Sequence, residues 1–226
     1  MPADKGGLEG IVVARSELCA IDGAKGVLVY RGYDIRDLAE HASYEEVAHL
    51  LLRGEVPSSD ERDAFKEALA EARPVSGEGC QVVDLSVADG APMEMLRTAV
   101  SATSFDDPDK ESNDEDANQR KAIRLIAKIP TLIARYQRRR EGKEPVDPDP
   151  ELDYAANFLY MLRGEQPSEE EARTFDVAMI LHADHEMNAS TFTARVIAST
   201  LSDMHSAVTG AIGALKARST VAPTSR

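Results

Sequence analysis

Two short runs near the start of the chain are rich in β-branched and aromatic residues and differ from the sequence that follows. From residue 11 to about residue 33 they read IVVARSELCAID and GVLVYRGYD, joined through the segment Asp22–Gly26. Two glycines in so short a connection are typical of a tight turn between paired strands. The pattern therefore predicts a small β-ribbon at the edge of the molecule.

From Ile35 onward, the start and stop signals are those of helices. Three pairs fit the capping box, in which a Ser side chain and a Glu side chain each accept a hydrogen bond from the other's backbone N–H. They are Ser43 with Glu46, Ser58 with Glu61, and Ser168 with Glu171. Two glycines directly follow apolar runs and mark helix ends. They are Gly54 after HLLLR and Gly164 after LYMLR.

Further helices are expected at 93–103, 118–129, 131–140, 151–162, 169–186 and 190–215, with hydrophilic loops at 106–116 and 142–151. The segment 188–215 is dense in Ala, Ser, Thr and Gly. Small residues let helices approach closely, so we expect a buried or subunit-contacting helix pair there. No change of composition marks a second domain. The predicted fold class is all-α, a single helical body with the N-terminal ribbon at its edge.

The composition supports this class and excludes others. Hydrophobic residues make up 42% of the 226 positions and there is no Trp, which suits helices packed through small and aliphatic side chains. Asp and Glu outnumber Lys and Arg by 40 to 26, for a net charge of −14. Such a surface repels phosphate groups, so we expect no nucleic-acid partner and no binding to a membrane surface. Two interpretations of this charge stay open: adaptation to a salt-rich cytoplasm, where salt screens the repulsion, or an ordinary acidic soluble protein.

The cysteines and the termini bear on location. Cys19 and Cys80 are too few and too far apart for a disulfide framework, so we expect reduced thiols. The N-terminal sequence MPADKGGLEG lacks the apolar core of a signal peptide. No apolar run approaches the ~20 residues of a membrane span. We therefore expect a soluble, cytoplasmic protein.

One short block concentrates the side chains that could carry chemistry. The sequence LHADHEMN holds two histidines, two acids and an amide: His182, Asp184, His185, Glu186 and Asn188. Histidines three positions apart share a face of a helix, so both could reach one ligand. Three interpretations stay open, which are a zinc site, a structural histidine pair, and a site that binds a substrate carboxylate. The order H-x-x-H-E matches no common zinc motif and no third ligand is evident, so a metal is not expected.

This block stands inside a longer pattern that resembles the citrate synthase family. The matching phrases are IDGAKGVLVYRGYDIRDLA at 21–39, YEEVAHLLLRGEVP at 44–57, PMEMLRTAVSA at 92–102, AKIPTLIARYQR at 127–138, AANFLYMLRGE at 155–165 and LHADHEMNASTFTARVIASTLSDMHSAVTGAIGALK at 181–216. They keep the family order over about residues 8–216. The 2-methylcitrate synthases share most of these phrases, so the resemblance leaves the acyl-CoA substrate open.

The resemblance implies an almost wholly α-helical fold with a large domain, a late-inserted small domain and a homodimer joined through long helices. Residues 1–216 would be the N-terminal part of the large domain, without the small domain, and the dimer contact would run through 188–215. The implied activity is acyl transfer in the tricarboxylic acid cycle, in which acetyl-CoA and oxaloacetate give citrate by acid–base and electrostatic catalysis. Acetyl-CoA enters as a substrate, and no metal or redox cofactor is implied.

Carried over by position, the resemblance implies one functional residue. His185 corresponds to a histidine that helps to hold oxaloacetate, and His182 and Asn188 beside it are assigned supporting roles. No catalytic residue is expected, because the family motifs GPLHGGAN and G-x-G-H-R do not occur in the sequence, and the family's catalytic aspartate has no counterpart. We expect the chain alone to be inactive. An alternative is a non-catalytic helical module that pairs with a full-length or C-terminal partner.

The last residues, 217–226, read ARSTVAPTSR and match nothing in the family pattern. The family continuation GPLHGGANQSVM can be written in GC-rich codons. Removing one G from those codons gives this tail followed by a stop codon. The tail is therefore predicted to arise from a one-nucleotide frameshift, either in the gene or in its sequencing.

Overall fold

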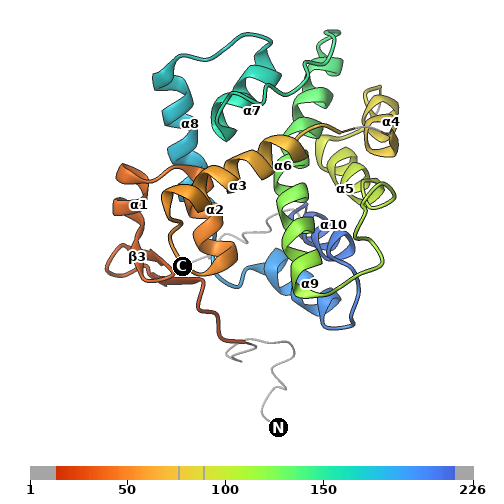
Figure 1. Cartoon of the computed structure of the whole chain (residues 1–226). Coiled ribbons are helices and arrows are strands. Elements are labelled where there is room, and N and C mark those ends of the chain that lie inside the picture. Colours follow the sequence, from red (N-terminus) through yellow and green to blue (C-terminus); the bar gives the residue numbers. More distant parts are fainter. Residues whose placement is uncertain (1–13, 76, 89, 217–226) are drawn as a thin grey trace, which may run out of the picture.

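The structure is a computed structural model that describes residues 14–75, 77–88 and 90–216. Within these residues the chain forms one three-stranded sheet and ten helices (Figure 1). The strands are β1 Cys19–Asp22, β2 Val27–Tyr30 and β3 Tyr33–Asp34. The helices are α1 Ile35–His41, α2 Tyr44–Arg53, α3 Ser59–Ala72, α4 Gly77–Ser86, α5 Pro92–Ala102, α6 Glu115–Arg140, α7 Tyr154–Arg163, α8 Glu169–Leu181, α9 Ala189–Ala198 and α10 Met204–Leu215. The predicted fold class, a helical body with a small ribbon, is confirmed.

The ribbon forms where the β-rich runs predict it. β1 and β2 are antiparallel, with Ile21 opposite Leu28. The turn between them is closed by the backbone N–H of Lys25, which donates to the carbonyl of Asp22 at 3.1 Å. The short β3 then pairs with β2. Residues 11–13 of the predicted first run lie outside the described residues, as does the tail predicted to be frameshifted.

All three predicted capping boxes are present. At the starts of α2, α3 and α8, the Ser side chain accepts from the Glu backbone N–H and the Glu carboxylate accepts from the Ser backbone N–H. The two predicted stops are also confirmed, because Gly54 and Gly164 end α2 and α7 with φ values of 94° and 88°. This left-handed conformation costs a residue with a Cβ ~1–2 kcal/mol, so it suits glycine.

One helix replaces the two predicted at 118–129 and 131–140. α6 runs without a break through Pro130. A proline inside a helix has no N–H for the carbonyl four residues earlier, which here belongs to Ile126. The hydroxyl of Tyr154 on α7 donates to that carbonyl at 2.7 Å. A tertiary contact therefore replaces the hydrogen bond that Pro130 cannot make.

Other helix limits also differ from the prediction. The segment 190–215, expected to be one helix, forms two. The second, α10, begins after Asp203, whose side chain accepts from the N–H of Ser206 at 2.9 Å. The small-residue segment is thus the expected helix pair, α9 and α10. The helix expected at 151–162 begins only at Tyr154. No signal in the sequence predicts α4, whose sequence GEGCQVVDLS contains two glycines.

The long helix α6 is the centre of the helical body and contacts α3, α4, α5, α7 and α10 (Figure 1). Three groups of buried apolar side chains form the core. One lies among α4, α5, α6 and α10 around Leu132, and one lies among α2, α3, α6 and α7 around Leu69. The third joins the ribbon to α1, α2 and α8 around Tyr30. This third group matters most for the site, because it connects the N-terminal ribbon to the end of α8.

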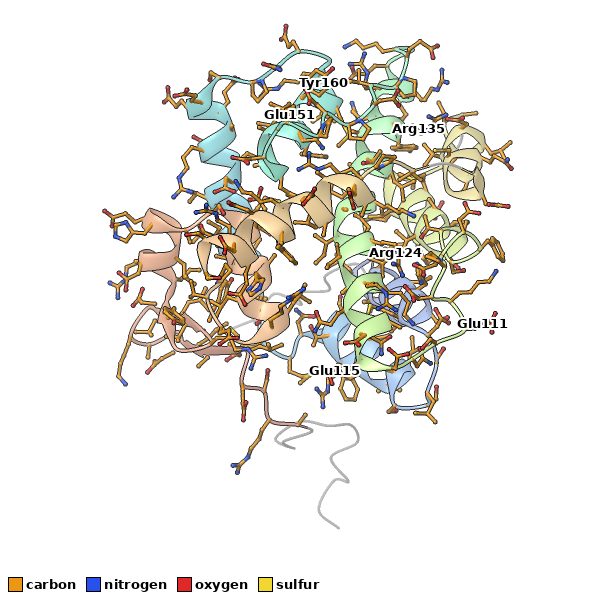
Figure 2. The ribbon with its side chains drawn as sticks, in the orientation of Figure 1. Glu111, Glu115, Arg124, Arg135, Glu151 and Tyr160 are labelled. Carbon is orange, nitrogen blue, oxygen red and sulfur yellow. The ribbon has the colours of Figure 1, made fainter. Side chains whose placement is uncertain are left out.

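Charged side chains cover the outside of this body, among them Glu111, Glu115 and Glu151 (Figure 2). Inside it, the Arg124 guanidinium of α6 binds the carboxylate of Asp107 through two hydrogen bonds of 2.7 and 2.9 Å. Of the helices that the structure describes, none is long and apolar enough to cross a membrane.

Candidate functional site

The polar block LHADHEMN forms the end of α8 and most of the connection to α9. The helix expected over 169–186 ends at Leu181, so that prediction was wrong in its last turn. His182 caps the helix, and its Nδ1 lies 2.7 Å from the carbonyl oxygen of Ala178, one turn back. The chain then leaves the helical path and passes through Glu186, which has a positive φ of 55°.

Because the helix ends, His182 and His185 do not share a helical face. The His182 ring is bound back to α8, whereas His185 lies further along the loop with its side chain exposed. The prediction that both histidines lie on one face of a helix, as a shared zinc ligand would require, was therefore wrong. Over the described ranges, no group of three or more His, Cys, Asp and Glu side chains is arranged to hold a metal ion.

The N-terminal ribbon holds the loop on both sides of His185. The hydroxyl of Tyr30 donates to the carbonyl of Asp184 at 3.0 Å and lies 3.2 Å from its backbone nitrogen. The backbone N–H of Ile21 donates to Oε1 of Glu186 at 3.0 Å. Tyr30 is itself fully buried. The position of the His185 backbone is therefore set by residues that lie more than 150 positions earlier in the chain.

The thiol of Cys19 lies on the ribbon side of the same loop. Burial and a hydrogen bond with the Asp184 side chain raise the pKa of this thiol to about 11. Because the thiolate is the nucleophilic form, this group stays protonated and unreactive at neutral pH. Cys19 and Cys80 are both free, and Cys19 packs against the apolar group around Tyr30.

His185 lines an open depression of about 560 Å³. The lining comes from the segment before and at the start of β1 and from the loop before α9: Ala14, Arg15, Ser16, Cys19, His185, Glu186, Met187 and Asn188. Of the three predicted site residues, His185 and Asn188 meet at this surface and His182 does not line it. Asn188 also has a structural task, since its Oδ1 accepts from the N–H of Thr191 at 2.9 Å and begins α9.

Sequence reasoning missed the N-terminal side of this depression. Arg15 and Ser16 carry no local signal of a site, and only the packing of the ribbon against the loop brings them to His185. The depression thus offers an imidazole and a guanidinium, both of which donate to carboxylate or carbonyl oxygens. One oxygen of the Glu186 carboxylate is already occupied by the N–H of Ile21. The arrangement suits a small acid that carries several oxygens.

The fold and the site define a mostly helical protein in which an N-terminal β-ribbon holds an exposed histidine on the loop between two helices. A family model described as citrate synthase, C-terminal domain, matches residues 7–220. The chain therefore belongs to the citrate synthase family, and the resemblance seen in the sequence is confirmed.

Curated relatives agree with this assignment. The chain is 52% identical over 215 residues to a citrate synthase of Haloferax volcanii, a match that covers 93% of this chain and 57% of the relative. It is 47% identical to citrate synthase 2 of Bacillus subtilis, and that match covers 93% of this chain and 56% of the relative. It is 43% identical to a 2-methylcitrate synthase of Mycobacterium tuberculosis, covering 96% and 55%. The chain spans about half the length of the curated relatives it matches.

Solved structures give the same picture. The citrate synthase of Pyrobaculum aerophilum superimposes with a TM-score of 0.88 at 38% identity, over 92% of this chain and 54% of that one. The citrate synthase of Thermoplasma acidophilum superimposes with a TM-score of 0.85 at 30% identity, over 92% and 55%. That second structure is a ternary complex with carboxymethyl coenzyme A and oxaloacetate.

Proposed function

We propose that this chain supplies the oxaloacetate-binding loop of a citrate synthase, which condenses acetyl-CoA with oxaloacetate to citrate in the tricarboxylic acid cycle. The observation that carries the proposal is the exposed His185 in an open depression, within a family match of residues 7–220. The ternary complex of the Thermoplasma acidophilum relative supports the choice of ligands. In this proposal acetyl-CoA is a substrate, and no separate cofactor takes part.

His185 would donate a ring N–H to an oxygen of oxaloacetate. A histidine suits this role because it hydrogen-bonds an anionic substrate in either protonation state. Asn188 and His182 would act as positioning residues. The first begins α9 directly after the loop and the second ends α8 directly before it, so both fix where His185 stands.

The condensation itself would need groups beyond these. The motifs that supply the enolising histidine and the catalytic aspartate in the family do not occur in the 226 residues. We therefore propose that the chain releases no CoA when it is assayed alone. The general acid–base step would be completed only with a full-length or C-terminal partner.

A homodimer through 188–215 is part of the same proposal. α9 has no buried residue, and Val196 and Leu201 expose 49% and 85% of their surfaces. Exposed apolar side chains on a helix pair are typical of a surface that another subunit covers. A cytoplasmic location is proposed as well, in keeping with the free thiols of Cys19 and Cys80.

The test is a CoA-release assay with acetyl-CoA and oxaloacetate. The chain is measured alone and after co-expression with the C-terminal part of the Haloferax volcanii citrate synthase. We expect no release alone and release in the complemented sample, where His185→Ala raises the KM for oxaloacetate. His41→Ala, which removes an exposed histidine on α1, is the matched control. Release by the chain alone would refute its proposed inactivity.

The acyl-CoA substrate is tested separately, with propionyl-CoA as the second candidate, because the Mycobacterium tuberculosis relative is a 2-methylcitrate synthase. The complemented sample is assayed with propionyl-CoA at the same concentration. A matched sample combines the N-terminal and C-terminal parts of the Haloferax volcanii enzyme. A higher kcat/KM with propionyl-CoA in the sample with this chain than in the matched sample would assign the chain to the 2-methylcitrate branch. Equal effects of His185→Ala and His41→Ala with either acyl-CoA would contradict the role of His185.

A further inference from the structure

The side chain of Tyr30 joins the N-terminal ribbon to the loop that carries His185. Its ring is fully buried in the apolar group shared by the ribbon, α1, α2 and α8, and Ala183 of the loop packs against the same group. Burial raises the pKa of the Tyr30 hydroxyl, so the group keeps its proton at neutral pH. The packed ring therefore fixes the place of a hydroxyl that can both donate and accept a hydrogen bond.

That hydroxyl is bonded to the peptide groups on both sides of Asp184. It donates to the Asp184 carbonyl oxygen at 3.0 Å and accepts from the Asp184 backbone N–H at 3.2 Å. The carbonyl oxygen of Leu181, the last residue of α8, lies 3.5 Å away. The Asp184 carbonyl belongs to the planar peptide group that joins Asp184 to His185. Holding its oxygen therefore restricts the direction in which the His185 backbone begins.

The residue after His185 is held as well. The backbone N–H of Glu186 donates to Oδ1 of Asp184 at 2.9 Å, and Oε1 of Glu186 accepts from the backbone N–H of Ile21 at 3.0 Å. The φ of Glu186 is 55°, a left-handed conformation that is unfavourable for a residue with a Cβ. Such a conformation persists only where the surrounding contacts enforce it. The loop therefore keeps its path because the ribbon holds it on both sides of His185.

His185 itself is exposed between these two held residues and lines the depression. A hydrogen bond from its ring to a substrate oxygen weakens steeply when the angle is poor. If the loop were free to move, only a fraction of the molecules would present the ring correctly, and the apparent affinity would fall by that fraction. The contacts that fix the loop therefore bear directly on binding at His185.

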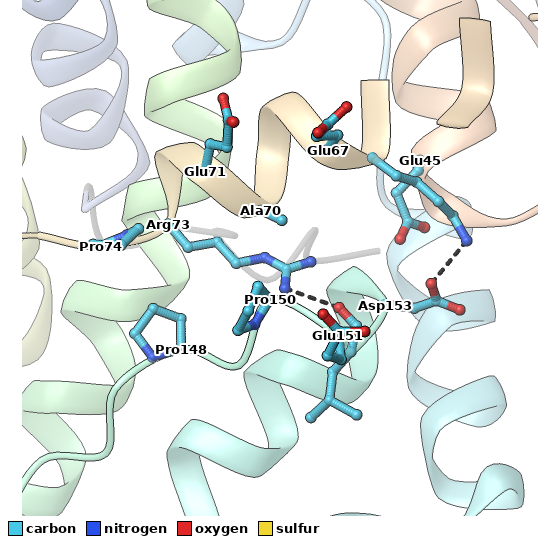
Figure 3. Close-up of a pocket in the computed structure, with 12 residues that line it drawn as sticks. Glu45, Glu67, Ala70, Glu71, Arg73, Pro74, Pro148, Pro150, Glu151 and Asp153 are labelled. Carbon is cyan, nitrogen blue, oxygen red and sulfur yellow. Dashed lines mark hydrogen bonds and ion pairs between the residues drawn. The ribbon is translucent and has the colours of Figure 1, made fainter. Parts of the chain in front are cut away.

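A larger cavity, of about 590 Å³, provides a contrast (Figure 3). It lies between α3 and the segment that leads into α7, and the two cations in its lining are Lys66 and Arg73. Lys66 is paired with Asp153 at 2.7 Å, and Nη1 of the buried Arg73 donates to two backbone carbonyls, both at 2.8 Å. These cations hold the cavity wall together. At the depression, by contrast, the ribbon holds the backbone and the His185 ring stays exposed.

We propose that Tyr30 is a positioning residue for oxaloacetate binding and acts through His185. Its hydroxyl holds the peptide group from which His185 extends, so the imidazole is already placed when the substrate arrives. Tyr30 is buried and makes no contact with the substrate itself. The inference rests on the proposed function, because it takes oxaloacetate as the ligand of the depression. It adds a residue of the N-terminal ribbon to the binding site.

The first measurement is amide hydrogen exchange in the whole chain, which needs no substrate. Tyr30→Phe keeps the buried ring and removes only the hydroxyl. We expect the Asp184 amide to exchange at least about tenfold faster in this variant, because its acceptor is lost. The amide of Gly54, which donates to the Leu50 carbonyl at the end of α2, should keep its rate. An unchanged rate at Asp184 would overturn the inference.

The second measurement uses the complemented sample of the CoA-release assay. We expect Tyr30→Phe to raise the KM for oxaloacetate about tenfold and to leave the KM for acetyl-CoA unchanged. In the His185→Ala background, Tyr30→Phe should not raise the KM for oxaloacetate further, because a positioning residue acts only through the group that it positions. Tyr154→Phe is the matched control. It removes another buried hydroxyl, which donates to the Ile126 carbonyl at 2.7 Å, and should leave both KM values unchanged.

The outcomes separate this inference from the proposed function. If His185→Ala raises the KM for oxaloacetate and Tyr30→Phe does not, the inference is wrong and the proposed function stands. The same holds if Tyr30→Phe raises the KM equally with and without His185, or if Tyr154→Phe raises it as much, since the effect would then come from the fold as a whole. No CoA release from the complemented parent chain, or no effect of His185→Ala, would refute the proposed function and this inference with it.

Discussion

The carboxylate of Glu45 on α2 accepts a hydrogen bond from the backbone N–H of Tyr154, the first residue of α7, with 2.9 Å between Oε1 and N. Asp176 on α8 does the same for Tyr44, the first residue of α2, also at 2.9 Å. The first N–H groups of a helix have no partner inside it. In both cases the acceptor is a carboxylate on a neighbouring helix: α8 supplies it for α2, and α2 supplies it for α7. The two contacts therefore link α8, α2 and α7.

The first prediction concerns the pH dependence of stability at Glu45. Burial raises the pKa of this carboxyl, and the hydrogen bond from Tyr154 opposes the rise. The folded chain then holds the proton more tightly than the unfolded chain. This contribution to stability is present below the unfolded pKa and is lost as pH rises through the folded pKa.

Glu45→Gln removes the titrating group, so the variant does not lose this contribution to stability as the pH rises. Its amide oxygen can still accept from the backbone N–H of Tyr154. We therefore expect the Tm of the variant, relative to the parent chain, to increase steadily between pH ~4 and pH ~7. Glu67→Gln, on the exposed side of α3, should show no such trend. A relative Tm that stays flat would contradict the prediction. Glu45→Ala, which leaves the Tyr154 N–H unpaired, should lower stability by about 1–3 kcal/mol.

The buried ion pair between Asp107 and Arg124 gives the second prediction. The Asp107 side chain is 1% exposed and the Arg124 side chain 16%, so both charges are largely removed from water. Removing one partner of a buried pair costs about 3–5 kcal/mol when the other charge is left without compensation. Arg124 keeps a second carboxylate, because its Nη2 lies 2.6 Å from Oδ2 of Asp109. We therefore expect Asp107→Asn to lower the free energy of unfolding in urea by less than that, about 1–3 kcal/mol. Asp63→Asn, at a surface pair with Arg62, should cause no measurable change.

The third prediction tests the close packing of α9 against α10. A Cβ added at Gly210 on α10 would overlap Cδ1 of Ile197 on α9, whereas one added at Gly213 would lie 3.7 Å from the nearest atom, Cδ of Arg97. Overpacking of this kind costs about 1–3 kcal/mol. Gly210→Ala should therefore destabilise the chain, and Ile197→Val should restore part of the loss.

Gly213→Ala is the matched control for the same helix. Alanine is favoured over glycine in a helix interior by up to about 1 kcal/mol, and here there is room for the methyl group. We expect it to be neutral or stabilising in the same urea titration. Equal destabilisation by both alanine substitutions would show that the two positions are equally crowded.

The fourth prediction concerns salt. The net charge of −14 implies self-repulsion that salt screens, and a relative at 52% identity belongs to Haloferax volcanii. We expect the Tm to rise as KCl increases from ~0.15 M to ~3 M, because the Debye length falls to a few ångströms or less over that range. A Tm that stays constant would favour an ordinary acidic protein. Sucrose at matched osmolality is the control, because it stabilises folded proteins by exclusion from their surface without screening charge. Charge screening therefore requires a larger rise in Tm with KCl than with sucrose.

Much of the local structure could be predicted because its signals lie close together in sequence. The capping box of Ser43 and Glu46 and the stop at Gly54 involve residues a few positions apart. Pro130 shows where such signals fail. Its effect on α6 depends on the Tyr154 hydroxyl, which is 28 residues from the carbonyl that it reaches. The end of α8 at His182 was mispredicted for a similar reason, since the loop that follows is held by the ribbon.

The sequence by itself determined the ribbon, the type of most helices, the acidic surface and the family, because these follow from local patterns and from an ordered set of phrases. Only the tertiary structure decided that His182 and His185 separate, that Arg15 reaches the His185 depression, and that Glu45 caps α7. Contacts of this kind join parts of the chain that are far apart in sequence. They are set by how buried surfaces pack and how buried polar groups are satisfied, which no short window of residues specifies.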